Sequence, residues 1–466
     1  MDIKEQNSVK SMPEEIVENK MGVLPVNKLL INMSLPIMIS MLVQALYNVV
    51  DSIFVSRICE NALTAVSLAF PLQSIMIALG GGMGVGVNAI LSKSLGEKDY
   101  NNVNKAAMNG IFLSVINFII FILVGIFAVK PFYYSQTNDM EIIGFGIDYL
   151  TIVCCASIGI YAQFIFERLL QSTGRTVCTM ITQSTGAVIN LIFDPILIFG
   201  LFGFPALGVR GAAIATVMGQ IVAGTFAYIL NIKMNPEVQI KFRGFRPDFE
   251  VIKKIYSVGL PSIIMQSIGS VMVYGLNKIL IGFSSTATAV FGVYFKLQSF
   301  VFMPIFGLNN GMVPIIAYNY GAQKRDRMVK TIKLSVMYAF SIMTLGTVAF
   351  WLFSSQLLLL FDASEIMLGM GVPALRIISV HFPIAAFCII IGSVFQALGR
   401  AVYSMINSIM RQIVVLLPAA YLLSLTGEVN NVWWSFPIAE GMSLVVTTFF
   451  LVKVYREIIS KVGNNL

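Results

Sequence analysis

Apolar residues occur along this chain in twelve long runs separated by short polar segments. A helix needs about 20 apolar residues to cross the hydrocarbon core of a bilayer, so each run predicts one span. Gly, Ser and Asn interrupt the runs without the alternation of a transmembrane barrel, which favours helices. The runs cover roughly 29–55, 62–91, 106–130, 142–170, 176–200, 206–231, 254–281, 287–318, 330–352, 366–397, 402–424 and 432–454. We predict an all-α integral membrane protein with twelve transmembrane helices.

Composition agrees with this pattern. The 466 residues are 57% hydrophobic and only 12% charged, and the mean hydropathy is +0.82. A water-soluble globular domain of this size does not have such a composition. The five cysteines have no metal-type spacing, so we expect no metal centre and no organic cofactor.

The basic residues are distributed unevenly between the two sides of the predicted membrane. With the N-terminus inside, 24 of the 31 Lys and Arg residues fall in inner tails and loops, five fall outside and two fall within spans. Inner loops of membrane proteins carry such an excess. We therefore predict a multi-pass protein of a prokaryotic cytoplasmic membrane with both termini in the cytoplasm. The net charge of +8 is then a topology signal, and we expect the lipid bilayer but no nucleic acid as a partner.

The chain repeats itself at one constant offset in residue number, which indicates an internal duplication. Residues 171–181 and 396–406 are identical at six of eleven positions without a gap. Other matches at this offset are Leu35-Pro36 with Leu260-Pro261, Leu72-Gln73-Ser74 with Leu297-Gln298-Ser299, Gly86 with Gly311, and Gly96 with Gly321. Each copy has six spans, an even number, so a pseudo-twofold axis along the membrane normal relates the copies.

This duplication predicts a domain organisation. The expected segments are an N-terminal tail 1–28, a first six-helix lobe 29–231, a cytoplasmic linker 232–251, a second six-helix lobe 252–455 and a C-terminal tail 456–466. Two repeated lobes are typical of transporters, in which a central site faces either side as the lobes rock against each other. We expect a monomer.

Asp51 and Asp194 lie within predicted spans of the first lobe and have no counterpart in the second lobe. Ionisable groups at bilayer depth are costly and by default mark a functional site. The repeat places Leu276 opposite Asp51 and Ala419 opposite Asp194, so the scaffold does not require these acids. The alternative is a structural role, in which each acid pairs with a nearby Arg or lies at the water interface.

Amides accompany both acids at helical spacing. Gln44, Asn48 and Asp51 are four and three residues apart and share one face of the first span, while Asn190 and Asp194 share a face of the fifth. Such an oxygen-rich cage suits a proton or Na⁺.

The order of these motifs resembles the multidrug and toxin extrusion (MATE) family, in its prokaryotic subgroup. The resemblance rests on Leu35-Pro36, Val50-Asp51-Ser52, Leu95-Gly96, Gln171 to Arg175, Asn190 to Pro195 and Phe436 to Glu440. It implies cation coupling at Asp51, Asn190 and Asp194, with Thr216 as a weaker match. Some members carry a glutamate on the seventh span, whereas residues 261–271 here contain no acid, so we expect coupling in the first lobe alone.

Other polar residues are candidates for a substrate cavity. Glu440 is an acid within the last span, and Lys296 and Arg411 are bases within spans of the second lobe. They form either a charge-balanced structural cluster or a site for charged substrates, with Gln298 as a further candidate. His381 is either a neutral packed residue or a proton relay. Glu167 and Arg168 are expected to extend their charged ends toward the inner interface.

The Gly-rich run 80–86 lies inside a span and has no following Lys-Ser or Lys-Thr, so close helix packing explains it better than a phosphate loop.

The sequence thus predicts a secondary antiporter rather than an enzyme. It would export amphipathic, often cationic, drugs or toxins in exchange for H⁺ or Na⁺. Two alternatives remain. A related flippase for lipid-linked oligosaccharide or cell-wall precursors needs a basic cavity, for which only Lys296 and Arg411 qualify. A membrane enzyme needs a catalytic cluster, and this chain has one His and no nucleophile motif.

Overall fold

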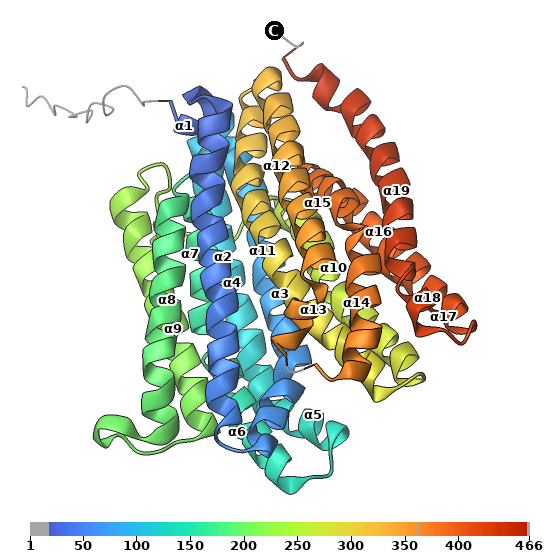
Figure 1. The fold of residues 1–466 in the computed structure, drawn as a ribbon. Coiled ribbons are helices and arrows are strands. Elements are labelled where there is room, and N and C mark those ends of the chain that lie inside the picture. Colours follow the sequence, from blue (N-terminus) through green and yellow to red (C-terminus); the bar gives the residue numbers. More distant parts are fainter. Residues whose placement is uncertain (1–17, 362, 464–466) are drawn as a thin grey trace, which may run out of the picture.

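The computed structural model describes residues 18–361 and 363–463 of the chain, and every regular element within them is helical. The long helices run side by side in one bundle (Figure 1). The first half of the chain forms α1 (Lys20–Val23), α2 (Val26–Ser56), α3 (Glu60–Gly96), α4 (Tyr100–Phe127), α5 (Val129–Gln136), α6 (Met140–Cys155), α7 (Ile158–Ser172), α8 (Thr176–Phe199), the 3₁₀ turn η1 (Leu201–Gly203) and α9 (Val209–Met234).

The second half follows the same plan. Its elements are α10 (Phe249–Ile281), α11 (Ser285–Gly321), α12 (Arg325–Leu352), α13 (Ser354–Leu359), α14 (Glu365–Ser379), α15 (Phe382–Ala397), α16 (Ala401–Ile409), the π-helical turn η2 (Met410–Leu416), α17 (Leu417–Ser424), α18 (Val429–Val432), α19 (Ser435–Glu457) and the 3₁₀ turn η3 (Ile459–Lys461).

The prediction of about twelve membrane helices is confirmed. Among the described residues, ten helices are long and apolar enough to cross a membrane, and two bent pairs bring the number to twelve if each is one span. The pairs are α6 with α7, bent by 44°, and α14 with α15, bent by 48°. The sequence predicted these two runs, 142–170 and 366–397, as single spans. In the second pair Pro383 stands in the first turn of α15, where its missing N–H interrupts the helical ladder.

The repeat reappears in the helix boundaries. Helices α3 and α11 begin and end at positions that the offset of the repeat makes equivalent, and so do α4 and α12. Helix α8 matches the continuous segment α16–η2–α17 in the same way. Even the left-handed turn residues repeat, because Lys98 and Gln323 form one such pair and Gly174 and Gly399 form another. The duplicated sequence therefore folds into a duplicated backbone.

The two halves meet along a seam of four helices, with α3 against α10 and α2 against α11. Glycines stand at its closest points. A Cβ atom on Gly86 would lie 2.2 Å from the carbonyl oxygen of Ile255, and one on Gly311 would lie 2.4 Å from Oγ of Ser34. Side chains larger than hydrogen would push the helices apart, as in other closely packed membrane helices. The assignment of the Gly-rich run to close packing is confirmed.

The ends of α3 and α11 contact each other symmetrically. A Cβ on Gly96 would lie 2.0 Å from the carbonyl oxygen of Tyr318, and one on Gly321 would lie 2.1 Å from that of Lys93. Because Tyr318 is the repeat equivalent of Lys93, the two contacts are copies of one another. Such reciprocal contacts are what a twofold relation produces. The pseudo-twofold axis therefore passes between these two helix ends.

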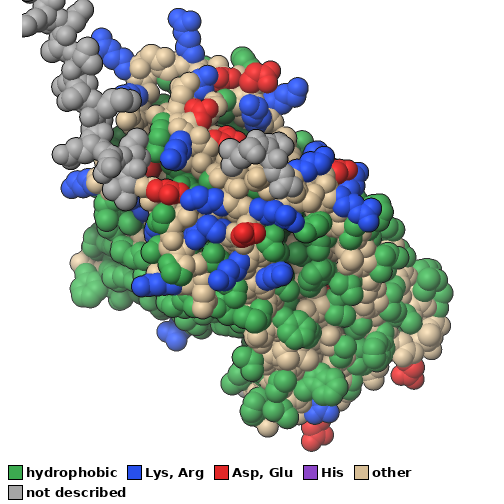
Figure 2. Space-filling model, turned by 90° about the horizontal axis from the view of Figure 1, so that it is seen from above, with side chains coloured by type: hydrophobic (Ala, Val, Ile, Leu, Met, Phe, Trp, Pro, Cys, Tyr) green, Lys and Arg blue, Asp and Glu red, His purple; other side chains and the backbone are tan. Residues whose placement is uncertain are grey.

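Both described ends of the chain lie on the same side of the bundle (Figure 1). Lys and Arg side chains gather on this side, which we call the basic face (Figure 2). The glycine contacts of the seam lie in the parts of α2, α3, α10 and α11 nearest this face. Farther along α2, Gln44 and Asn48 are exposed. The seam is therefore closed at the basic face.

The seam makes a prediction about glycine. We expect Gly86→Ala to lower the stability of the protein by roughly 1–3 kcal/mol, because the new methyl group meets backbone that cannot rotate away. Gly144→Ala is the control, since a Cβ there has nothing within 4 Å. Thermal unfolding of both purified variants in detergent checks this, and equal midpoints would contradict the close backbone packing.

Candidate ion site in the first half

Helices α2 and α8 bring together the two acids that the sequence singled out. The carboxyl groups of Asp51 and Asp194 lie within hydrogen-bonding distance of each other. Asp194 is fully buried and Asp51 is half-buried. Two carboxyl groups form a hydrogen bond only when one of them carries a proton to donate. The contact is therefore suited to holding one proton, or a cation in its place.

An amide and a hydroxyl complete the group. Nδ2 of Asn190 donates to Oδ1 of Asp194 at 3.3 Å and to Oγ1 of Thr216, on α9, at 3.3 Å. Asn190 and Asp194 face the same way because they are one helical turn apart on α8. The structure thus places Asp51, Asp194, Asn190 and Thr216 in one cluster. We call these four residues the acid cluster.

Several oxygens of the acid cluster lack partners. Oδ1 of Asp51, Oδ2 of Asp194 and Oδ1 of Asn190 are buried and receive no hydrogen bond from an N–H or hydroxyl of the described residues. Among the described residues, neither acid has a Lys, Arg or His within ion-pair distance. Buried polar atoms are nearly always satisfied, by protein, water or an ion. The unpartnered oxygens therefore mark a place for a proton, a cation or water.

Three further residues near the acid cluster were not predicted as site residues. Tyr47 and Tyr149 both lie close enough to interact electrostatically with Asp51 and Asp194. Nε2 of Gln73 donates to the hydroxyl of Tyr149 at 3.2 Å. Tyr47 could have been found because it stands one turn before Asp51 on the same helix face. Tyr149 carries no local signal, since only the packing of α6 brings it to this point.

Two predicted members lie apart from the acid cluster. Gln44 and Asn48 are exposed on α2, and within the described part of the chain their side chains form no hydrogen bond with either acid. They share the helix face of Asp51, but they are exposed whereas Asp51 is half-buried. Their role in ion coupling stays a prediction.

The second half holds a different polar cluster. Nη1 of Arg411 lies 3.1 Å from Oε2 of Glu440, whose side chain is only 3% exposed. Arg411 stands on the π-helical turn η2, a feature often found at functional sites. Pro418 follows shortly afterwards and cannot donate to the helical ladder. Of the three charged candidates of the second half, Arg411 and Glu440 thus form an ion pair.

Neighbouring residues separate into two groups. His381 is buried, stacks on the ring of Phe436 with centroids 5.9 Å apart, and lies near both Arg411 and Glu440. Lys296 is exposed, lies over the ring of Phe361 and has no ion-pair partner among the described residues. Gln298 is half-buried on the same helix. Lys296 therefore does not belong to the ion pair, because its long side chain extends away from it.

The expectation for Glu167 is wrong. Its side chain does not reach the interface but is 2% exposed within the first half. It accepts hydrogen bonds from Gln163 at 3.1 Å, Thr182 at 3.0 Å and Gln183 at 2.7 Å. Neighbouring amides and hydroxyls on α7 and α8 satisfy the carboxylate inside the bundle, so it has no need to reach water.

Arg168 also bonds inside the bundle. Its Nη1 donates to Gln171 at 2.8 Å and, across the seam, to Asn310 on α11 at 3.0 Å.

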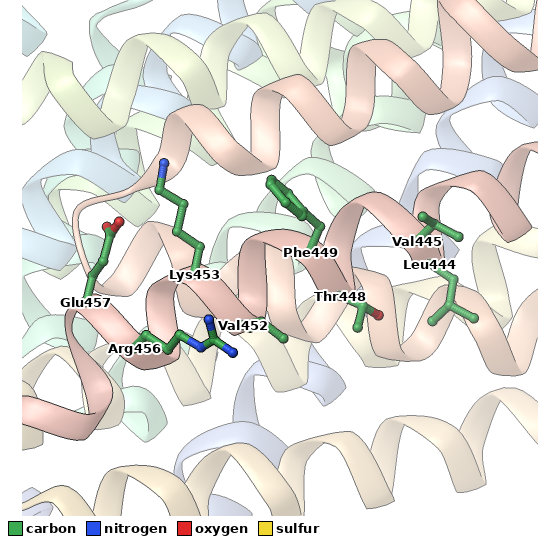
Figure 3. Close-up of a pocket in the computed structure, with 8 residues that line it drawn as sticks. All are labelled: Leu444, Val445, Thr448, Phe449, Val452, Lys453, Arg456 and Glu457. Atoms are coloured by element: carbon green, nitrogen blue, oxygen red, sulfur yellow. The ribbon is translucent and has the colours of Figure 1, made fainter.

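An open groove of about 770 Å³ runs along the outer surface of α19 (Figure 3). Its lining includes Leu444, Val445, Phe449 and Val452, which are apolar, and Lys453 toward the end nearest the basic face. This apolar surface with a basic end suits a helix that faces lipid. The groove contains none of the candidate site residues.

The chain matches the MatE family model twice, over residues 36–196 and 261–422. These two matches cover more than half of the sequence and start at Pro36 and Pro261, which are equivalent positions of the internal repeat. The chain belongs to the MatE family, whose members are transporters and not enzymes.

Named relatives and solved structures agree. The multidrug export protein MepA of Staphylococcus saprophyticus is 29% identical over 412 residues, covering 88% of this chain and 90% of that protein. MepA of Staphylococcus aureus is 27% identical over 419 residues, covering 90% and 92%. A structure described as the outward-facing conformation of a multidrug resistance MATE family transporter has a TM-score of 0.89, with 27% identity and coverage of 97% and 100%. A transporter from Pyrococcus furiosus has a TM-score of 0.87 at 27% identity, with coverage of 96% and 99%. The flippase alternative is not favoured.

The ion pair of the second half makes a prediction. Arg411→Met leaves Glu440 buried without a counter-charge, and we expect a loss of about 3–5 kcal/mol of stability. The double variant Arg411→Met/Glu440→Leu should recover most of it, because both charges are then removed. Thermal unfolding in detergent measures both. A double variant as unstable as the single one would show that packing, not charge, dominates.

Proposed function

We propose that this protein is a secondary active antiporter that exports amphipathic, often cationic, small molecules in exchange for an inward-moving ion. The acid cluster carries this proposal, because it combines two adjoining carboxyl groups, unpartnered oxygens and no basic neighbour inside a membrane lobe. The names of the MepA relatives support drugs or toxins as cargo. Arg411, Glu440, His381 and Gln298 are proposed cargo contacts from the second half. The protein would act as a monomer, since one chain supplies the whole acid cluster.

The proposed orientation puts the basic face in the cytoplasm. The excess of Lys and Arg on that face supports it. The closed seam then lies inside, and the described state faces outward. The likeness to a structure described as outward-facing supports the same assignment. Alternating access requires a second packing of the two halves that opens at the basic face, in the manner of a rocker switch.

The proposed coupling ion is a proton, with Na⁺ at Asp51, Asn190 and Asp194 as the alternative. A shared proton accounts for the contact between the two acids without any further ligand. Loading the proton from outside neutralises the acid cluster, and losing it inside restores a charge that the apolar lobe disfavours. Ion and cargo would therefore favour different packings, which is what exchange requires.

Removing one carboxylate tests the proposed site. We expect Asp194→Asn to reduce gradient-driven efflux at least about tenfold in proteoliposomes, because an amide cannot take up and release the proton. Asp51→Asn should do the same. Glu60→Gln, at the exposed start of α3, is the control and should transport normally. Undiminished efflux by Asp194→Asn at equal protein level would exclude the acid cluster as the coupling site.

Imposing the two gradients separately tests the ion. Purified protein in vesicles should extrude a fluorescent organic cation when a pH gradient is applied, and should not respond to a Na⁺ gradient at constant pH. The reason is that two adjoining carboxyl groups can share one proton without any further ligand. Efflux driven by Na⁺ alone would instead show that the unpartnered oxygens bind Na⁺.

A further inference from the structure

Residues 18–24, which we call the N-terminal strap, cross the seam at the basic face. The strap contains the short helix α1 and leads directly into α2. It is not a loose tail, because Met21 is fully buried in the core that both halves share. The exchange proposed above assigns no role to the strap.

The second half binds the strap through its backbone. Nη2 of Arg327 donates to the carbonyl oxygens of Met21 at 3.0 Å and Leu24 at 2.7 Å. Nδ2 of Asn319 also donates to Met21, at 3.1 Å. Nζ of Lys324 donates to the carbonyl of Gly22 at 3.1 Å and forms an ion pair with Glu18. Hydrogen bonds from charged donors are stronger than neutral ones, so this attachment is firm. The bond to Lys324 lowers the pKa of Glu18, which keeps this carboxylate charged at neutral pH.

The first half and the linker that follows it hold the strap at Asn19. Nδ2 of Asn19 donates to the carbonyl of Thr173 at 3.1 Å and to Oε1 of Glu237 at 3.0 Å. Glu237 is fixed in turn by Arg175, with Nη2 and Oε2 2.8 Å apart. The strap is therefore bonded to both halves at once.

The internal repeat shows that the scaffold does not require this arrangement. The three donors Asn319, Lys324 and Arg327 correspond to Ser94, Asp99 and Asn102 in the first half, which offer no Lys or Arg. Ser94 and Asn102 line a groove of about 290 Å³ instead of holding a peptide. The residues that correspond to the strap, 243–249, also bond to the opposite half, but through different residues. Asp248 pairs with Lys105 at 3.1 Å, and its backbone N–H donates to Oδ1 of Asn109 at 2.9 Å. The donors Asn319, Lys324 and Arg327, and the backbone carbonyls that they bind, are therefore specific to the strap.

Space around the strap allows it to move. Cavities of about 780 and 270 Å³ adjoin it, and both are lined by Glu18, Asn19, Tyr100 and Glu237. Bonds that face such space can exchange with water without unpacking the long helices. By contrast, a strap enclosed on all sides could leave only if the bundle came apart.

We infer that the N-terminal strap is a latch that holds the two halves together at the basic face. Opening at this face must separate Thr173 and Glu237 from Asn319 and Arg327, so the strap has to release its bonds to one of the two halves. This inference rests on the alternating access proposed above but not on the identity of the coupling ion. The latch sets how often the protein visits the state that is open at the basic face.

Cysteine labelling tests the latch. Ser34 is 2% exposed and packs against Gly311 across the seam, so a cysteine there reacts only when the halves separate. Ser34→Cys is introduced into a variant whose five native cysteines are replaced by alanine, and its reaction rate with a maleimide is measured in nanodiscs. We expect Asn19→Ala and Arg327→Gln each to raise the rate about tenfold, the scale of one or two charge-assisted hydrogen bonds.

Arg325→Gln is the matched control. This residue lies on the same helix, but its guanidinium bonds to Tyr455 within the second half, so the labelling rate should not change. Unchanged rates for both latch variants would overturn the inference. Thermal unfolding confirms that each variant is folded, and Lys324→Gln replaces Arg327→Gln if that variant is not. Labelling is measured without cargo or ion gradient, so failure of the proposed exchange would leave this result intact.

Discussion

Backbone contact between the two halves, without side chains in between, is the constraint on which this structure depends. In lipid no hydrophobic force drives helices together, so their association relies on close packing. Gly86 and Gly311 provide it near the middle of the seam, and Gly96 and Gly321 provide it at the basic face. Such contacts are weak enough individually to be exchanged for another packing. The charged strap adds to them from outside the membrane region.

The two halves share a backbone but differ in how they treat buried charge. In the first half, Asp51 and Asp194 adjoin each other with no basic partner among the described residues. In the second half, Arg411 neutralises Glu440 permanently, because an arginine does not lose its proton in a protein. The internal repeat therefore accounts for the shared scaffold but not for these buried charges.

The sequence could predict much of this because membrane insertion imposes rules that are local. Span length, basic loops and the constant offset of the repeat are each visible without a partner segment, and the helix boundaries of α3, α4, α11 and α12 agree with them. Asp51, Asn190 and Asp194 could be selected because polar residues in apolar runs are conspicuous. The bend between α6 and α7 could not be predicted, since residues 155–158 contain no Pro or Gly.

By itself, then, the sequence determined the class of fold, the internal repeat and the two acids of the first half. The fold class and the acids follow from polar residues compared with the apolar runs around them, and the repeat follows from matching residues at one offset. Only the tertiary structure decided which side chains meet. It joined Asp51 to Asp194 across two helices, left Gln44 and Asn48 exposed, and enclosed Glu167 among amides. It also attached the strap to Arg327, which lies far away in the chain, in the second half. Contacts of this kind depend on how helices rotate and approach one another, which no local pattern of residues specifies.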